Sequence, residues 1–414
     1  MRIGVYFTAG KRNGGVYQYS LGFLEALAKN NQNEYVIITT SPDIPAKYLH
    51  DKRFEVINLA GDSQAKFEKT RTYLANVVGK YLGIIMSTLY RARLFFLVNL
   101  AIRYTQREIL KTIDQARLDL LILPAGTDIS YLVKVPTIVA VHDLQHRLNP
   151  QYKEVSYGGR WEYRENYYRR TCRQSLRILV DSEIGKEDVL SCYPKTDPNK
   201  IVILPFLTPP YLDPAIPSSY VKKTLKKYQI ITPYIYYPAH FWSHKNHLTL
   251  VKALNILNKK NIQITLVMTG SKDVDFSTYH QVMVYAKEKG IEQYVKFLGY
   301  VSSREVSSLY KGALALTMPT AFGPTNIPIL EAWSIGTPVI YSDIRGCKDQ
   351  LGNAGLLADP DNPQAWAESI ELLGRDKKLV SRLVKNGKRR VSAWTIDDFA
   401  AKVTNMLASL NMLK

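Results

Sequence analysis

Residues 313–342, ALALTMPTAFGPTNIPILEAWSIGTPVIYS, read as a buried strand, a loop of small residues, a helix and a second buried strand. We expect the helix to begin at Pro328, since proline tolerates the first helical position, where its missing N–H would have no partner. Glu331 would then lie in the first turn. Such a start presents free backbone N–H groups to an anion, although many ordinary strand–helix connections begin in the same way.

The same alternation runs through all 414 residues. Strands are predicted at 2–7, 34–40, 54–59, 118–123, 137–143, 177–182, 234–239, 263–270, 295–299, 313–318 and 338–342. Helices are predicted at 15–29, 247–259, 279–290, 302–311, 363–374 and 376–392. Continuous apolar strands separated by helices are typical of parallel sheets covered on both faces. The chain is therefore expected to be an α/β protein.

The Pro-rich segment 206–220 divides the chain into two doubly wound domains, 1–205 and 221–394, and reads as a linker. Residues 395–414 are predicted to form a helix that packs back on the first domain. Two such domains would face each other across a cleft at the carboxyl ends of their strands, where ligands of open α/β sheets bind.

Composition narrows the classes of protein. The net charge is +19, from 55 Lys and Arg against 36 Asp and Glu, which favours anionic partners such as nucleic acid, anionic lipid or phosphorylated small molecules. No nucleic-acid-binding module is recognisable, so nucleic acid ranks last. Three scattered cysteines and the lack of a signal peptide predict a cytoplasmic protein without disulfides or a zinc site.

Several predicted strands end in residues that can do chemistry. Gly14 and Gly15 precede a helix and would let a ligand approach the backbone. His142 and Asp143 end a strand in VAVHDLQH, where the histidine could act as an acid or base, orient a hydroxyl, or simply bond to nearby backbone.

The stretch PAHFWSHKNH places Lys245 among His240, His244 and His247. A metal cluster is conceivable there, but a lysine at a strand's carboxyl end suits a phosphate better. The paired aspartates of DVD, residues 273–275, could hold a metal, although a solvated loop explains them better. We therefore expect no metal site.

Six segments, in order and spacing, resemble the retaining family 4 glycosyltransferases. They are GGVYQYSLGFLEAL, VHDLQH, VDSEIGKEDV, YYPAHFWSHKNH, FLGYVSSREVSSLYKGA and PTAFGPTNIPILEAWSIGTPVIYSD. The resemblance implies the GT-B fold of two Rossmann-like domains. It also implies transfer of a hexose, with retention, from a UDP-, GDP- or dTDP-sugar to an acceptor hydroxyl, without cofactor or metal.

Position by position, the resemblance implies that Lys245 neutralises the donor diphosphate and that Glu331 binds the ribose. It places His142, with Asp143, beside the reacting sugar, so that these four residues form the expected catalytic set. The expected nucleotide-sugar site comprises Gly14, Gly15, His240, Lys245, Gly270, Tyr300, Val301, Gly323, Thr325, Asn326, Ile327 and Glu331.

Two departures concern the family pattern between Pro319 and Glu331. The first of its paired glutamates is replaced by Gly323, so the donor hexose stays open, and Thr325 and Asn326 could supply replacement hydrogen bonds. The usual arginine ahead of the lysine is also absent, and His240 or its neighbours stand in its place.

Residues 73–111 combine bulky apolar side chains with cations. On one helix, Arg93, Arg103, Arg107 and Lys111 would share a side with Phe96 and Leu100, and Arg91 interrupts the apolar run. This pattern favours a surface helix in a layer of anionic lipid headgroups, and two core-packed helices are the alternative. The first reading predicts a peripheral protein of the inner face of the plasma membrane with a lipid-linked acceptor.

We therefore expect a hexosyltransferase that acts on a saccharide or lipid-linked acceptor in cell-surface polysaccharide or glycolipid assembly. One rival is a sugar-nucleotide epimerase, which shares the architecture and needs no acceptor. Another is a GT-B binding protein with impaired catalysis, which the replacement at Gly323 makes conceivable.

Overall fold

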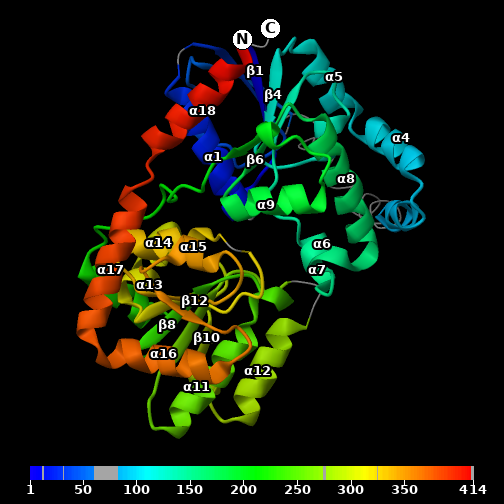
Figure 1. Ribbon diagram of the computed structural model, residues 1–414. Coiled ribbons are helices and arrows are strands. Elements are labelled where there is room, and N and C mark those ends of the chain that lie inside the picture. The colour runs from blue at the N-terminus through cyan, green and yellow to red at the C-terminus, as the bar shows by residue number, and fades with distance from the viewer. Residues whose placement is uncertain (12–13, 31, 60–82, 274–276, 324, 412–414) are drawn as a thin grey trace, which may run out of the picture. The chain divides into compact units, whose positions relative to one another are not determined.

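The computed structural model describes residues 1–11, 14–30, 32–59, 83–273, 277–323 and 325–411. The chain forms two units: Met1–Phe206 together with Ile396–Lys414, and Leu207–Thr395. Each unit holds one sheet, with helices on either side of it (Figure 1).

The sheet of the first unit has the strand order β3-β2-β1-β4-β5-β6-β7, and all its pairs are parallel. Its strands are β1 (Arg2–Phe7), β2 (Glu34–Thr39), β3 (Phe54–Asn58), β4 (Leu120–Leu123), β5 (Thr137–Ala140), β6 (Arg177–Val180) and β7 (Ile201–Ile203). The order reverses between β1 and β4. In open α/β sheets such a switch point marks the ligand-binding edge.

The main helices of the first unit cover both faces of this sheet. They are α1 (Gly15–Ala28), α2 (Ala46–Leu49), α4 (Phe95–Thr105), α5 (Arg107–Gln115), α6 (Gln145–Leu148), α7 (Lys153–Ser156), α8 (Arg160–Gln174), α9 (Glu183–Cys192) and α18 (Ile396–Asn411). Residues 83–91 are also helical. The last helix, α18, packs on α1, where the ring of Phe399 meets the rings of Tyr19 and Phe23 at 6.1 and 5.6 Å.

The second unit repeats this topology with the strand order β10-β9-β8-β11-β12-β13, again parallel throughout. Its strands are β8 (Tyr234–Pro238), β9 (Thr265–Thr269), β10 (Val295–Phe297), β11 (Ala315–Met318), β12 (Val339–Ser342) and β13 (Leu356–Ala358). The switch point lies between β8 and β11, so the segments after these two strands are expected to meet at a binding edge.

Eight α-helices complete the described part of the second unit. They are α10 (Ser218–Lys227), α11 (His247–Lys259), α12 (Thr278–Glu288), α13 (Ser303–Gly312), α14 (Ile327–Ile335), α15 (Cys347–Leu351), α16 (Pro363–Arg375) and α17 (Lys377–Ser392). The buried α14 packs closely on α17. A Cβ added to Gly387 of α17 would lie 2.2 Å from the ring of Trp333 of α14, so only glycine fits there. The indole N–H of Trp333 donates to the carbonyl of Ala354 at 2.9 Å.

The predicted fold class is confirmed, and every predicted strand is present. The two strands that were not predicted, β7 and β13, are three residues long and lie at sheet edges. Runs so short carry almost no periodic signal. No helix of the described residues is both long and apolar enough to cross a membrane.

Two boundaries need correction. The helix expected from Pro328 begins one residue earlier, at Ile327, and Glu331 lies beyond its first turn. Within the segment 206–220 that was read as a linker, α10 already begins at Ser218.

Candidate functional site

In the second unit, β8 leads into a single 3₁₀ turn that carries Lys245. Asn246 ends this turn in the left-handed region, at φ 51°, and α11 begins at the next residue. The Lys245 side chain is half-buried, and burial lowers its pKa to about 8. Within the part of the chain that the structure describes, no carboxylate forms an ion pair with its ammonium group. Lys245 is thus a desolvated cation that an anion would stabilise.

The loop that follows β11 lies against this turn. The backbone N–H of Ala321 donates to the carbonyl of His244 at 2.7 Å, and the rings of Phe322 and His244 stack 4.0 Å apart. Gly323 adopts φ 94°, a region that favours glycine. The carbonyl of Gly323 accepts hydrogen bonds from the Asn326 side-chain amide at 2.7 Å and the Tyr341 hydroxyl at 2.8 Å.

Helix α15 holds the same loop from its other side. The Gln350 side chain accepts from the backbone N–H of Asn326 at 2.9 Å and donates to its carbonyl at 3.0 Å. At the start of α15, burial raises the pKa of the Cys347 thiol to about 11, and the nearby charge of Lys245 opposes this rise. Lys245, the loop and the start of α15 therefore surround one place in the second unit.

Glu331 lies inside the second unit. It is only 6% exposed, its Oε2 accepts from the Tyr310 hydroxyl at 2.6 Å, and its Oε1 accepts from the hydroxyl of Tyr211. Burial raises the pKa of Glu331, and the two tyrosine hydrogen bonds counteract that rise. A carboxylate has about four acceptor positions, so both oxygens retain capacity for a further donor.

Other predicted residues gather at the ends of β8, β9 and β10. The Nδ1 atom of His240 accepts from the backbone N–H of Ser271 at 2.9 Å, and its ring lies 6.0 Å from that of the exposed Tyr300. Gly270 has φ 131°, and a Cβ there would lie 2.7 Å from the carbonyl oxygen of Ala239. Val301 follows Tyr300, just before α13.

Two segments are candidates for a metal site: the histidines around Lys245 and the DVD segment, residues 273–275. His247 is fully buried between the rings of Tyr237 and Phe241, at 4.7 and 4.2 Å, and burial lowers its pKa to about 3. Across the residues that the structure describes, no three His, Cys, Asp or Glu side chains are grouped as metal ligands. Of the DVD segment, 274 and 275 lie outside the described residues, and the backbone N–H of Asp273 donates to the Ser271 hydroxyl at 3.0 Å.

In the first unit, a cavity of about 350 Å³ opens at the carboxyl ends of β1, β4 and β5. Thr8, Gly126, His142 and Asp143 are among its lining residues. The Nε2 atom of His142 lies 2.8 Å from the carbonyl oxygen of Pro124, so Nε2 carries the proton. In the neutral ring, Nδ1 is then an acceptor for a hydroxyl group.

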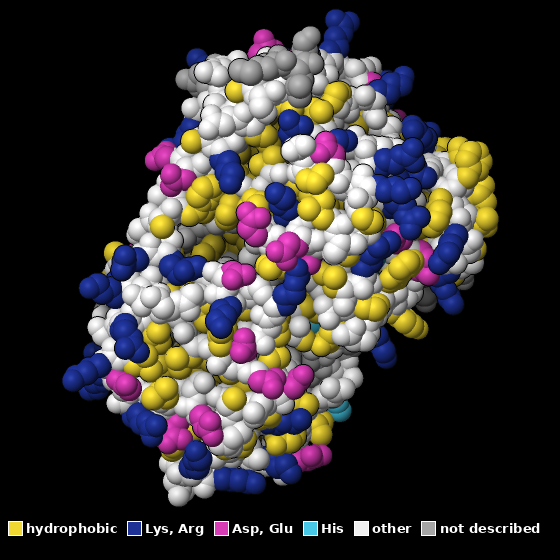
Figure 2. All heavy atoms as spheres, in the orientation of Figure 1, with side chains coloured by type: hydrophobic (Ala, Val, Ile, Leu, Met, Phe, Trp, Pro, Cys, Tyr) yellow, Lys and Arg dark blue, Asp and Glu magenta, His cyan; other side chains and the backbone are white. Residues whose placement is uncertain are grey.

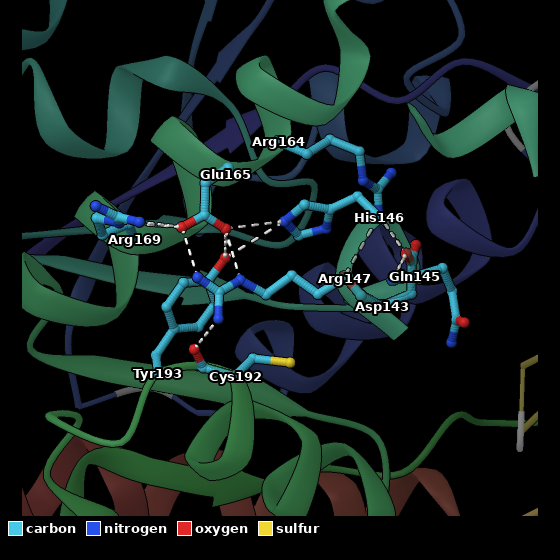
Figure 3. Close-up of polar contacts among 9 residues, drawn as sticks. All are labelled: Asp143, Gln145, His146, Arg147, Arg164, Glu165, Arg169, Cys192 and Tyr193. Atoms are coloured by element: carbon cyan, nitrogen blue, oxygen red, sulfur yellow. Dashed lines mark hydrogen bonds and ion pairs between the residues drawn. The ribbon is translucent and has the colours of Figure 1, made fainter. Parts of the chain in front are cut away.

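A network of ion pairs fixes the segment that follows His142 (Figure 3). The Asp143 carboxylate pairs with Arg164 and accepts from the backbone N–H of Gln145 at 3.0 Å. Burial acts to raise the pKa of Asp143, but the charge of Arg164 and the backbone hydrogen bond outweigh it and lower the pKa. Arg164 belongs to α8, so this helix orients the end of β5.

Glu165 on α8 is the centre of the network. Arg147 from α6 donates to both of its oxygens at 2.7 Å, and Arg169 donates to Oε1 at 2.6 Å (Figure 3). The Tyr193 hydroxyl adds a bond of 3.1 Å, and His146 lies at 3.4 Å. These donors outweigh burial and hold the pKa of Glu165 well below its usual range. Periodicity along the chain does not reveal this network, because Arg147 and Tyr193 lie 18 and 28 residues from Glu165.

The remaining predicted residues lie at separate places. Gly14, at φ 53°, is the N-cap of α1, and a Cβ there would meet nothing within 4 Å; residues 12 and 13 lie outside the described chain. Gly15 and Ile327 are the first residues of α1 and α14, and Thr325 is half-buried before α14.

Residues 83–111 do not form the single helix on which the shared face was predicted. Arg93 interrupts it at φ 56°, and Gln106 separates α4 from α5. The predicted membrane-surface residues are nevertheless all exposed: Arg91, Arg93, Phe96, Leu100, Arg103 and Arg107. The first ten residues of the 73–111 segment lie outside the described chain.

Comparisons with known proteins agree with this architecture. Residues 223–390, most of the second unit, match the family Glycosyl transferases group 1. Solved glycosyltransferases share the two-sheet fold over nearly the whole chain. The chain therefore has the GT-B fold, and most of its second unit is similar to the glycosyl transferases of group 1.

The individual relatives share little sequence identity with this chain. The O-antigen chain mannosyltransferase RfbU of Salmonella typhimurium is 24% identical over 96% of this chain and 97% of its own length. The O-antigen chain mannosyltransferase B of Escherichia coli is also 24% identical, over 56% of this chain. That match spans 60% of the relative's own length. The structure of Anabaena HepE in complex with UDP-glucose has a TM-score of 0.66 at 16% identity, covering 99% of this chain and 100% of that one.

Proposed function

We propose that this protein transfers a hexose from a nucleotide diphosphate sugar to a hydroxyl of a saccharide or lipid-linked acceptor. Two of the relatives are O-antigen mannosyltransferases, which supports a role in cell-surface polysaccharide or glycolipid assembly. The similarity of fold to a protein solved with UDP-glucose supports a nucleotide diphosphate sugar as donor, and we propose a UDP-, GDP- or dTDP-sugar.

The observation that carries the proposal is the surroundings of the Lys245 side chain. Its ammonium group is desolvated and, among the described side chains, lacks a carboxylate partner, which costs free energy unless an anion binds. It lies beside the loop that follows β11 and the start of α15, where a diphosphate could approach the backbone. We assign Lys245 to the donor diphosphate and Glu331 to the ribose.

The chemistry is assigned to the cavity of the first unit. His142 there offers Nδ1 as an acceptor beside Asp143, which suits a group that holds a hydroxyl in place during transfer. The proposed reaction retains the anomeric configuration and needs no metal, since Lys245 supplies positive charge at the diphosphate. We also propose that the protein works in the cytoplasm at the inner face of the plasma membrane, where a lipid-linked acceptor would lie.

The direct test follows release of the free nucleotide from UDP-, GDP- and dTDP-sugars, with and without a mixture of lipid-linked saccharides. Release that depends on the acceptor supports the proposal. Isomerised sugar nucleotide without acceptor would instead identify an epimerase, and binding without turnover under any condition would identify a binding protein.

Metal independence has a separate test. Activity is expected to persist in EDTA. Complete loss in EDTA, restored by a divalent metal, would contradict this part of the proposal and direct attention to the histidines around Lys245.

A further inference from the structure

The first unit carries a band of exposed apolar side chains on residues 83–105, which we call the apolar band. Phe96 is 74% exposed and Tyr104 is 72% exposed. The other large side chains of the band are Ile84, Ile85, Leu94, Leu97 and Leu100, each between 45% and 55% exposed. Figure 2 shows apolar side chains gathered at the right edge of the view, where Figure 1 places α4. A soluble surface rarely exposes so many neighbouring large apolar side chains without a partner.

The charge of the band has one sign. Residues 83–105 contain no Asp or Glu, and their charged residues are Arg91, Arg93 and Arg103; just beyond them, Arg107 pairs with Glu108 at 3.4 Å. Large apolar groups mixed with cations match the boundary between the headgroups and the acyl chains of an anionic bilayer.

A cavity of about 390 Å³, which we call the arginine cavity, lies where the band meets α8. The band contributes Arg93 and Phe95 to its lining, and α8 contributes Trp161, Arg169, Arg170 and Arg173. Two carboxylates, those of Glu162 and Glu165, also line the arginine cavity.

The four guanidinium groups that line the arginine cavity differ in the partners that they already bind. Arg169 is bound to Glu165, and Arg170 donates to the side-chain oxygen of Asn166 at 3.0 Å. In the described chain, neither Arg93 nor Arg173 has an acidic partner. Guanidinium groups bind phosphate oxygens through paired hydrogen bonds, so two such groups at one cavity suit a phosphate.

We propose that the arginine cavity binds the phosphate headgroup of an anionic membrane lipid while the apolar band enters the acyl boundary. The two features share Arg93 and Phe95, which places a phosphate next to a surface for hydrocarbon. The proposal names the lipid class and the site behind the membrane role proposed above, on which it rests.

Vesicle sedimentation with the full chain tests the proposal. We expect the protein to sediment with vesicles of phosphatidylcholine and phosphatidylglycerol and to stay free with pure phosphatidylcholine. Arg93→Gln with Arg173→Gln should weaken binding about thirtyfold, since each cation contributes about 1 kcal/mol near an anionic surface. The matched control, Lys222→Gln with Lys223→Gln, removes the same charge from exposed positions of the second unit and should bind like the wild type.

Two further double variants distinguish binding in the arginine cavity from general electrostatic attraction to the vesicle surface. Arg93→Lys with Arg173→Lys keeps the charge but loses the paired donors, and it should also bind more weakly. Phe96→Ser with Leu100→Ser should weaken binding roughly tenfold or more through lost apolar contact.

Wild-type affinity in the lysine pair or in the serine pair would overturn the proposal. Displacement of the protein from the vesicles by inorganic phosphate, at a concentration equal to that of the lipid phosphate, would also overturn the proposal, because the site would then need no lipid. The measurement uses neither donor nor acceptor, so its failure is distinct from a failure of glycosyl transfer.

Discussion

At the scale of single residues, the structure separates side chains that can meet a ligand from side chains already bound within the fold. His142 lines a cavity and has one ring nitrogen engaged by a backbone carbonyl. Glu331 is buried with a tyrosine hydroxyl on each oxygen. The two residues therefore call for different experiments.

Replacing His142 by alanine should lower turnover far more than donor affinity. The incoming hydroxyl must be held against the reacting sugar, and a group that does so acts mostly in the transition state. The expected loss in turnover is about a hundredfold. Measuring the turnover number and the donor Kd of the variant decides the matter, since a change in Kd alone would make His142 a donor-binding or structural residue.

Glu331→Gln should weaken nucleotide binding while leaving the fold intact, because the amide loses the charged acceptor for a ribose hydroxyl. Tyr310→Phe is the matched control, since it removes a hydrogen bond to the same carboxylate from the protein side. Titration calorimetry and thermal unfolding should be run on both. If both variants lower Tm and neither changes the nucleotide Kd, Glu331 acts only within the second unit.

At the scale of elements, α6 and α8 are joined through Glu165, which should therefore matter for stability. Glu165→Gln leaves Arg147 and Arg169 without a carboxylate, and losing one partner of such a buried group costs about 3 kcal/mol or more. Glu162→Gln, less than one turn earlier on α8, is the control and should change the free energy of unfolding little.

The same variant has a defined pH dependence. The pKa of Glu165 is lowered in the folded protein, so its stabilisation is complete above the unfolded value of about 4.3 and is lost as the pH falls below it. The stability gap between wild type and Glu165→Gln should therefore shrink from pH 6 to pH 3. A constant gap in urea unfolding across this range would show that the carboxylate charge is not what matters.

Periodicity reveals some elements and misses others for physical reasons. Helix α11 was predicted at its observed bounds, because apolar positions repeat along its whole length. The break at Arg93 was missed, since a left-handed arginine leaves no compositional mark. The Glu165 network was missed because it depends on α6 and α8 packing together, which spacing along the chain does not encode.

At the scale of the whole molecule, alternation of strands and helices was enough to predict the fold class. Both sheets reverse their strand order beside their first strand, so the segments at each switch point could be found from strand ends alone. What sequence could not give is the state of each side chain there. The burial of Lys245 and the tyrosines on Glu331 depend on packing among distant segments.

The proposed donor site depends most on Lys245, and its pKa of about 8 gives this residue a measurable signature. A bound diphosphate would favour the charged ammonium, so donor affinity should be full below pH 8 and fall as the pH rises above it, toward about tenfold per pH unit. Lys245→Arg, which stays charged, should lose this dependence, and Lys245→Gln should bind weakly at every pH.

The decisive measurement is the Kd of UDP-, GDP- and dTDP-sugars by titration calorimetry from pH 7 to pH 10, for the wild type and both variants. We predict that the Kd of the bound donor rises above pH 8 in the wild type alone. The same rise in Lys245→Arg and Lys245→Gln, or a wild-type Kd that is flat across the range, would contradict the assignment of the diphosphate to Lys245.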